Sequence, residues 1–113
     1  MSPITTHVLD ITRGCPAQGV EVVLEQRKAD GTWAERGRGR TNGDGRLTTL
    51  LADGTVQAGV YRLCFATASY FAALHTRSFY PEVLVTFEVH ESSKSYHVPL
   101  LLSPYGYSTY RGS

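Results

Sequence analysis

The chain has 113 residues, a formal net charge of +1 and an apolar fraction of 42%. This length predicts one domain, spanning residues 1–113, with one hydrophobic core. The small net charge disfavours nucleic acid or an anionic membrane as a partner. No apolar run approaches the roughly 20 residues that span a bilayer. Because the start lacks the features of a secretory signal and the chain does not close on a peroxisomal tripeptide, we expect a cytoplasmic protein.

The hydrophobic pattern has a period of two nearly throughout, which is typical of β-strands. Val20, Val22 and Leu24 alternate with Glu21 and Glu25, which predicts a half-buried strand. The Asp30-Gly31 pair that follows predicts a hairpin turn. Short strands separated by turn residues favour an all-β fold, an antiparallel β-sandwich. The predicted strands are 4–11, 20–25, 33–40, 46–51, 60–67, 83–90, 96–102 and the tail after Pro104.

Residues 68–76 form the one segment that predicts a helix, which ends before Phe79-Tyr80-Pro81. Cys15 and Cys64 could pair, but two cysteines in a chain without a secretory signal are more often free thiols.

Two histidines lie among apolar residues on the outward faces of predicted strands. Side chains alternate between the two faces of a strand. Tyr96, Val98, Leu100 and Leu102 therefore face the core, which puts His97 and Leu101 outside. His7 shares its outer face with Leu9 in the same way. An outer face of this kind favours a covered surface, such as a subunit interface, although a surface or purely structural histidine fits the same spacing.

Arg46 follows the turn cluster Asn42-Gly43-Asp44-Gly45 and begins a predicted strand. A guanidinium group there offers a rigid fork to a carbonyl group or an oxyanion. A solvated arginine fits the same position. A metal site made by His7 and His97 lacks a convincing third ligand, so we expect no metal.

The tail from Ser103 to Ser113 has a strand-like composition, rich in Tyr and Thr. Its last residue combines a serine hydroxyl with an α-carboxylate. We therefore expect Tyr110 and Ser113 to line a site. An orienting or substrate-binding serine is favoured over a nucleophile, because the chain has no Gly-x-Ser-x-Gly elbow.

Several motifs, taken in chain order, resemble the transthyretin-related 5-hydroxyisourate hydrolases. The resemblance covers essentially the whole chain, and the combination of its first and last motifs is very specific. The motifs are His7-Val8-Leu9-Asp10, Gly14-Cys15-Pro16-Ala17, Thr41 to Arg46, Phe79 to Val83, Tyr96 to Pro104 and Tyr110-Arg111-Gly112-Ser113.

The resemblance implies a transthyretin-like fold of two four-stranded antiparallel sheets and one short helix. It also implies a homotetramer, a dimer of dimers, with active sites in the channel between the dimers. The implied reaction hydrolyses a cyclic amide in the pyrimidine ring of 5-hydroxyisourate, without a cofactor or a metal.

The family's catalytic roles carry over to His7, Arg46, His97 and Ser113. His7, Arg46 and Ser113 would also bind the substrate, and Tyr110 would line its pocket. A histidine would activate water, and Arg46 would stabilise the oxyanion; we favour His97 as the base. The alternatives are a non-catalytic carrier of the transthyretin type and a sandwich domain for adhesion or sugar binding. A carrier has no need of these residues together, and an adhesion domain would be expected to have a secretion signal.

Overall fold

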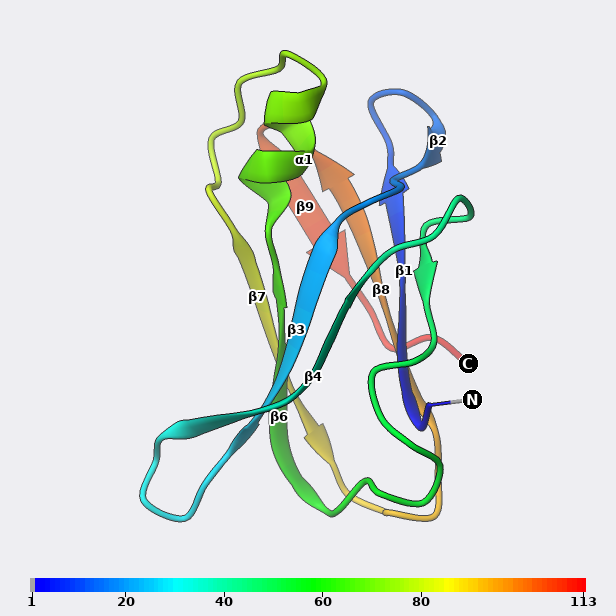
Figure 1. Cartoon of the computed structure of the whole chain (residues 1–113), viewed down its shortest axis with the longest axis vertical. Coiled ribbons are helices and arrows are strands. Elements are labelled where there is room, and N and C mark those ends of the chain that lie inside the picture. The colour runs from blue at the N-terminus through cyan, green and yellow to red at the C-terminus, as the bar shows by residue number, and fades with distance from the viewer. Residues whose placement is uncertain (1) are drawn as a thin grey trace.

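The computed structural model describes residues 2–113 and leaves Met1 outside the described part. Two β-sheets pack face to face, and a short helix lies at one end of the sandwich (Figure 1). The first sheet has the strand order β2-β1-β8-β9, with β5 also paired to β1, and the second has the order β4-β3-β6-β7. The elements are β1 Ile4–Asp10, β2 Cys15–Pro16, β3 Glu21–Arg27, β4 Trp33–Arg40, β5 Arg46–Leu47, β6 Gly59–Phe65, α1 Thr67–Ala73, β7 Val83–Val89, β8 Tyr96–Ser103 and β9 Gly106–Thr109.

The core lies between the two sheets and is built from alternate residues of the strands. Along β1, residues alternate between buried and half-buried, so that Ile4, Thr6 and Val8 point inward. On β8, Tyr96, Val98, Leu100 and Leu102 are buried in the same way. Both inward faces match the sequence prediction, and His7 and His97 therefore lie on the outer face of the first sheet.

The first sheet differs from the prediction of two purely antiparallel four-stranded sheets. It has five strands, two of which contain only two residues. In addition, β1 and β8 run parallel, with Ile4 opposite Tyr96 and Asp10 opposite Leu102. The alternation of side chains is the same in parallel and antiparallel strands. The hydrophobic pattern therefore contains no information on this direction.

The strand predicted for residues 46–51 is shorter than expected. Only Arg46 and Leu47 pair with β1. The chain then leaves the first sheet, and Leu50 is buried in the core. A Cβ atom at Gly37 of β4 would overlap the carbonyl oxygen of Leu50. The strand ends because the backbone turns toward β4, and a glycine there makes room for it.

The helix predicted for residues 68–76 is observed over Thr67–Ala73. It closes in a Schellman arrangement, in which Thr76 N–H donates to the Phe71 carbonyl and His75 N–H donates to the Ala72 carbonyl. His75 has a φ angle of 55°, the left-handed conformation that this closure requires. The helix therefore ends earlier than its hydrophobic pattern suggests.

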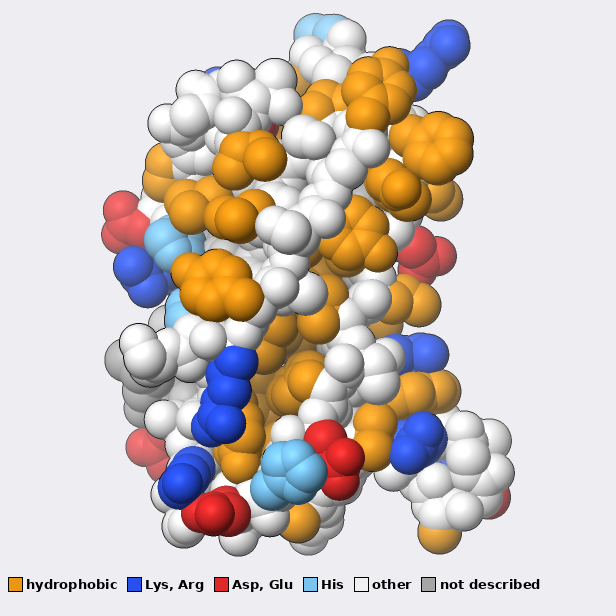
Figure 2. Space-filling model, turned by 180° about the vertical axis from the view of Figure 1, so that it is seen from behind, with side chains coloured by type: hydrophobic (Ala, Val, Ile, Leu, Met, Phe, Trp, Pro, Cys, Tyr) orange, Lys and Arg blue, Asp and Glu red, His pale blue; other side chains and the backbone are white. Residues whose placement is uncertain are grey.

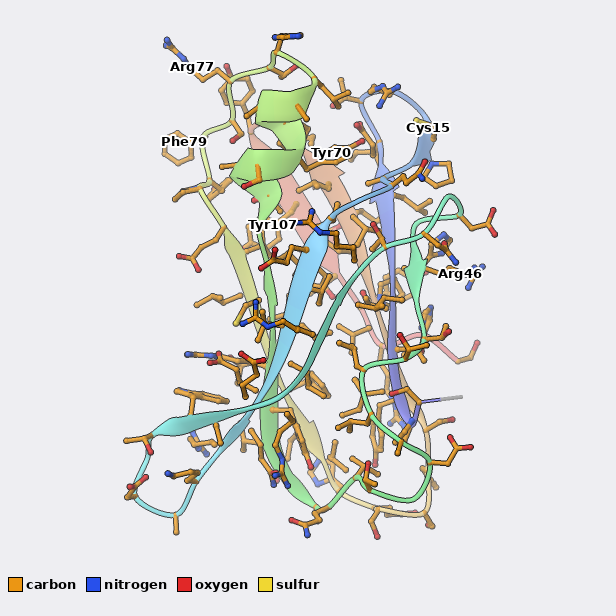
Figure 3. The ribbon with its side chains drawn as sticks, in the orientation of Figure 1. Cys15, Arg46, Tyr70, Arg77, Phe79 and Tyr107 are labelled. Atoms are coloured by element: carbon orange, nitrogen blue, oxygen red, sulfur yellow. The ribbon has the colours of Figure 1, made fainter. Side chains whose placement is uncertain are left out.

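A buried pair joins the helix to the end of β1. The Tyr70 hydroxyl donates a 2.7 Å hydrogen bond to Oδ2 of Asp10, which is 1% exposed. Oδ1 of Asp10 accepts the backbone N–H groups of Thr12 and Arg13. Burial, followed by the hydrogen bond to Asp10, raises the pKa of Tyr70 to about 12. Figure 3 shows Tyr70 on α1.

We expect Tyr70→Phe to destabilise the fold by about 1–3 kcal/mol, because it leaves a buried carboxylate without one of its donors. The melting temperature should fall by roughly 4 °C or more. Thermal unfolding measured beside Tyr107→Phe, which alters a tyrosine that is 41% exposed, provides the comparison. Equal melting temperatures in the two variants would contradict a stabilising role for this pair.

Both cysteines, which lie in the described part of the chain, are free thiols, as expected. Burial, and then a hydrogen bond to Glu25, raises the pKa of Cys64 to about 12, so this thiol is held in its unreactive form. In the described residues, 2–113, there is no helix with the length and apolar character needed to cross a membrane.

Candidate active site

Three strands of the first sheet bring His7, Arg46 and His97 to its outer face. β5 pairs antiparallel with β1 so that Arg46 lies directly opposite His7. β8 pairs with β1 on its other side, where His97 lies opposite Thr5. Directly opposed residues share a face and have neighbouring side chains. Residues that are far apart in the sequence therefore come together around β1.

The turn before β5 fixes the position of Arg46. The Asn42 side-chain oxygen accepts hydrogen bonds from the backbone N–H groups of Asp44, at 2.9 Å, and of Arg46, at 3.0 Å. Asn42 N–H also donates to the Arg46 carbonyl oxygen. The Arg46 side chain itself extends outward from β5 (Figure 3). Its guanidinium group is thus available to a ligand, while its backbone is held in place.

The same turn orients His7. Nε2 of His7 lies 2.8 Å from the carbonyl oxygen of Asp44. A carbonyl oxygen can only accept, so Nε2 carries the proton and, in the neutral ring, Nδ1 has a free lone pair. His7 is half-buried. The ring can therefore accept a hydrogen bond or a proton at Nδ1.

His97 is half-buried and held on two sides. Its Nδ1 lies 2.8 Å from the hydroxyl oxygen of Thr5, and its backbone carbonyl accepts the N–H of Gly112 at 2.8 Å. Burial, and then the positive charge of Arg46, lower the pKa of His97 below its ordinary value, with a further contribution from His7. A histidine in this environment is neutral near pH 7, which is the form that a general base requires.

A hollow of about 310 Å³ brings together three of the residues that the sequence singled out. Arg46, His97 and Ser113 all line it, and Thr5, Thr48 and Gly112 complete part of the wall. The hollow therefore combines a guanidinium group, an imidazole and a serine hydroxyl. These groups can bind a carbonyl-containing ligand, activate a water molecule and stabilise a developing negative charge.

Tyr110 lies in a neighbouring hollow of about 380 Å³, between β7 and the C-terminal tail. The two hollows share Tyr96 and His97 in their walls. The guanidinium group of Arg111 lies 4.8 Å from the ring centre of Tyr96. Tyr110 therefore lines a different hollow from Arg46 and Ser113, and His97 borders both.

Three residues around these histidines were missed in the sequence prediction: Thr5, Asp44 and Gly112. Each acts through a contact with His7 or His97. The outward position of Thr5 on β1 was readable from the strand pattern. Its place beside His97 depends on the strand register, which local patterns do not contain.

A larger hollow of about 500 Å³ lies elsewhere, between the loop around Cys15 and helix α1. Its lining includes Arg13, Arg40 and Tyr70 but none of the five predicted site residues. Size alone therefore does not mark the chemically best-equipped site. Within residues 2–113, no three side chains of the metal-binding types gather closely enough to hold a metal ion.

Residues 4–112 match the model of the HIUase/Transthyretin family. This chain belongs to the HIUase/Transthyretin family. Among curated members, the 5-hydroxyisourate hydrolase of Salmonella dublin is 47% identical over 110 residues, covering 97% of this chain and 80% of the relative. The 5-hydroxyisourate hydrolase of Mus musculus is 45% identical over 113 residues, covering 99% and 96%.

Solved structures of the family agree with the fold described above. The 5-hydroxyisourate hydrolase of Klebsiella pneumoniae superposes with a TM-score of 0.87 at 35% identity and covers 100% of both chains. Sea bream transthyretin in complex with thyroxine superposes with a TM-score of 0.92 at 33% identity, covering 97% of this chain and 94% of that one. Family members with this fold thus include both a hydrolase and a thyroxine-binding protein.

We expect Arg46→Gln to raise the pKa of His97, because the substitution removes the positive charge that opposes protonation of its ring. The measurement is an NMR titration of the His97 ring in the wild type and the variant. Arg36→Gln, which alters an exposed arginine of β4, is the matched control and should leave the titration unchanged. Identical titrations in the wild type and Arg46→Gln would mean that the two groups are not coupled.

Proposed function

We propose that the protein hydrolyses 5-hydroxyisourate in urate degradation. The reaction opens the pyrimidine ring at a cyclic amide and yields 2-oxo-4-hydroxy-4-carboxy-5-ureidoimidazoline. The observation that supports it best is the shared lining of one hollow by Arg46, His97 and Ser113. The hydrolase names of the Salmonella and mouse relatives, at 45–47% identity, agree with this assignment.

His97 acts as the general base in this proposal. Its lowered pKa keeps the ring neutral. The Thr5 hydroxyl, 2.8 Å from Nδ1, can accept a hydrogen bond from Nδ1–H, and in that tautomer Nε2 has a free lone pair. Nε2 takes a proton from water as the water oxygen bonds to the amide carbonyl carbon. The carbonyl oxygen becomes an oxyanion, which the guanidinium group of Arg46 stabilises. When the C–N bond breaks, the proton passes to the leaving nitrogen.

His7, Ser113 and Tyr110 complete the proposed site. His7 lies beside Arg46 and, with Nε2 held by Asp44, presents Nδ1 to the substrate or the attacking water. The hydroxyl group of Ser113, which lines the same hollow as Arg46 and His97, orients the substrate. Tyr110 lines the neighbouring hollow, which also has His97 in its wall.

The direct test is an absorbance assay on freshly generated 5-hydroxyisourate, with and without the protein. A hydrolase accelerates the decay in proportion to its concentration. A carrier of the transthyretin type, the second candidate, would bind a ligand without accelerating the decay. This alternative draws on the structural match to the thyroxine complex of sea bream transthyretin. An unchanged decay rate would contradict the proposed hydrolysis.

We also propose that residues 1–113 form one cytoplasmic domain that assembles into a homotetramer, a dimer of dimers. β7 and β9 are end strands of their sheets, and such edges can pair with another chain. Phe79, Tyr80 and Tyr107 stack edge to face beside these edges, with ring centres 4.9 and 5.3 Å apart. Figure 2, which views the molecule from behind, shows hydrophobic side chains gathered over much of the visible face.

A dimer of dimers needs a second interface besides the β7 and β9 edges. The apolar residues beside the proposed catalytic histidines support an interface on the outer face of the first sheet. Leu9 and Leu101 are half-buried on the outer face of the first sheet. Their burial would stabilise association by roughly 25 cal/mol per Å² of apolar area, before the costs of association. We expect sedimentation at micromolar concentration to give a tetramer. A monomer that retains full activity would contradict an active site shared between subunits.

A further inference from the structure

The C-terminal tail lies directly against the imidazole ring of His97. Gly112 N–H donates to the His97 carbonyl, and the two residues form an isolated antiparallel bridge. A Cβ atom built on Gly112 would lie 2.5 Å from Cδ2, 3.1 Å from Cγ and 3.3 Å from Cβ of His97. A contact of 2.5 Å is one that real Cβ atoms essentially never make, and the other two are tighter than most. The tail can therefore approach the ring this closely only because residue 112 has no side chain.

The backbone conformation of Gly112 does not itself require glycine. Its φ angle lies outside the left-handed region that most residues avoid. The constraint at this position is the space that His97 occupies, since the nearest three atoms all belong to that side chain. A substitution at Gly112 therefore acts on His97 directly.

A second contact holds the other side of the ring. The Thr5 hydroxyl lies 2.8 Å from Nδ1 of His97, while Gly112 lies against Cδ2, the carbon bonded to Nε2. Thr5 comes from β1 and Gly112 from the tail, so two separate segments limit the movement of one imidazole. A ring that is only half-buried would otherwise sample more than one staggered position.

We infer that Gly112 is a positioning residue for His97: its missing side chain lets the tail backbone hold the imidazole against Thr5, with Nε2 directed at the reacting water. The inference rests on the proposed function, in which His97 is the general base. It adds a role for a residue that neither binds a proton nor contacts the bond that breaks. The same close approach brings the next residue, Ser113, into the hollow with Arg46.

The clearest test is Gly112→Ala. The added methyl group must displace either the His97 ring or the tail. A reacting group moved by about 1 Å loses on the order of a hundredfold in rate, so kcat for 5-hydroxyisourate should fall about a hundredfold, with a smaller change in KM. If the tail lifts, the ring also becomes more solvated, and its pKa rises toward the ordinary value of about 6.5.

Gly106→Ala is the matched control. Gly106 lies in β9 of the same C-terminal segment, also outside the left-handed region, and its added Cβ would meet Ser103 Oγ at an ordinary 3.7 Å. This variant should retain the wild-type kcat and the wild-type His97 titration. On the other side of the ring, Thr5→Val should lower kcat. Thr5→Ser, which keeps the hydroxyl group, should retain a kcat close to that of the wild type.

Two outcomes would overturn the inference. One is Gly112→Ala with unchanged kcat and an unchanged NMR titration of His97. The other is a change in KM alone, which would mean that the tail contacts substrate without positioning the base. A double-mutant cycle adds a test by thermal unfolding: Gly112→Ala should cost much less stability in the His97→Ala background, where the two closest ring atoms are gone.

These measurements separate the inference from the proposed function. If the wild type does not hydrolyse 5-hydroxyisourate, the proposed function fails, and the NMR titration and the thermal cycle decide alone whether Gly112 holds the ring. If the wild type is active and Gly112→Ala behaves like Gly106→Ala, the hydrolase assignment stands and the positioning role is wrong.

Discussion

Replacing His97 with alanine is expected to lower kcat/KM for 5-hydroxyisourate about a hundred- to ten-thousandfold, the usual loss when a general base is removed. The fold should be retained, because His97 lies on the outer face of its sheet and contributes nothing to the core. The measurement is the decay of freshly generated substrate, with circular dichroism to confirm the β-sheet content.

Variants of the neighbouring residues extend this test. His7→Ala and Arg46→Ala should also lose much of the rate, and loss of an oxyanion donor typically costs about a hundred- to thousandfold. The losses should not add in double variants, since the residues act in one site. His75→Asn is the control: residue 75 is exposed beyond helix α1, and asparagine tolerates its left-handed conformation. Wild-type rates in all three site variants would refute the assignment.

The pH dependence of the wild type follows from the same histidine. His97 must be neutral to act as a base, and burial and the charge of Arg46 lower its pKa below about 6.5. kcat/KM should therefore stay high near pH 7 and fall on acidification, with a midpoint below about 6.5. The free energy of unfolding should fall as the pH drops from about 6.5 to the lower pKa of folded His97, because the unfolded chain protonates this residue at a higher pH than the folded protein does. An acid limb centred above pH 7 would exclude His97 as the base.

Deleting residues 110–113 is expected to reduce hydrolysis at least about a hundredfold. The deletion removes Ser113 from the hollow, Tyr110 from the adjoining one and the backbone contact of Gly112 with His97. When a general base loses its orientation, the reaction rate falls by about this factor. The core should survive, because Val8, Phe65 and Leu100 are fully buried elsewhere. Substrate decay and thermal unfolding, measured on the same preparations, separate lost activity from lost fold.

Tyr105→Ala provides the comparison for the deletion. Tyr105 lies in the turn that leads to β9, is 70% exposed and is absent from the lining of both hollows. The Tyr105→Ala variant should therefore keep wild-type activity. A truncated protein as active as Tyr105→Ala would mean that the tail is ordinary packing and that Ser113 has no role in the reaction.

The inward and outward faces of β1 and β8 were predictable from the sequence. Alternation of apolar and polar residues is a local property of a strand, and burial against a core converts it directly into structure. The outward positions of His7 and His97 followed from this alone. The helix was also located correctly, with its end shifted because His75 adopts the left-handed conformation that closes it. The motifs carried the family resemblance, which the comparisons confirmed.

The tertiary structure alone decided which of these residues meet. Thr5 and His97 are 92 positions apart and become neighbours through a parallel strand pair, and the alternating pattern does not distinguish a parallel pair from an antiparallel one. Arg46 reaches His7 through a strand of two residues, too short to produce a pattern of its own. The approach of Gly112 to His97 depends on the path of the tail after β9. Pairing between distant segments reflects the packing of the whole sandwich, whereas sequence periodicity reports only which face each segment buries.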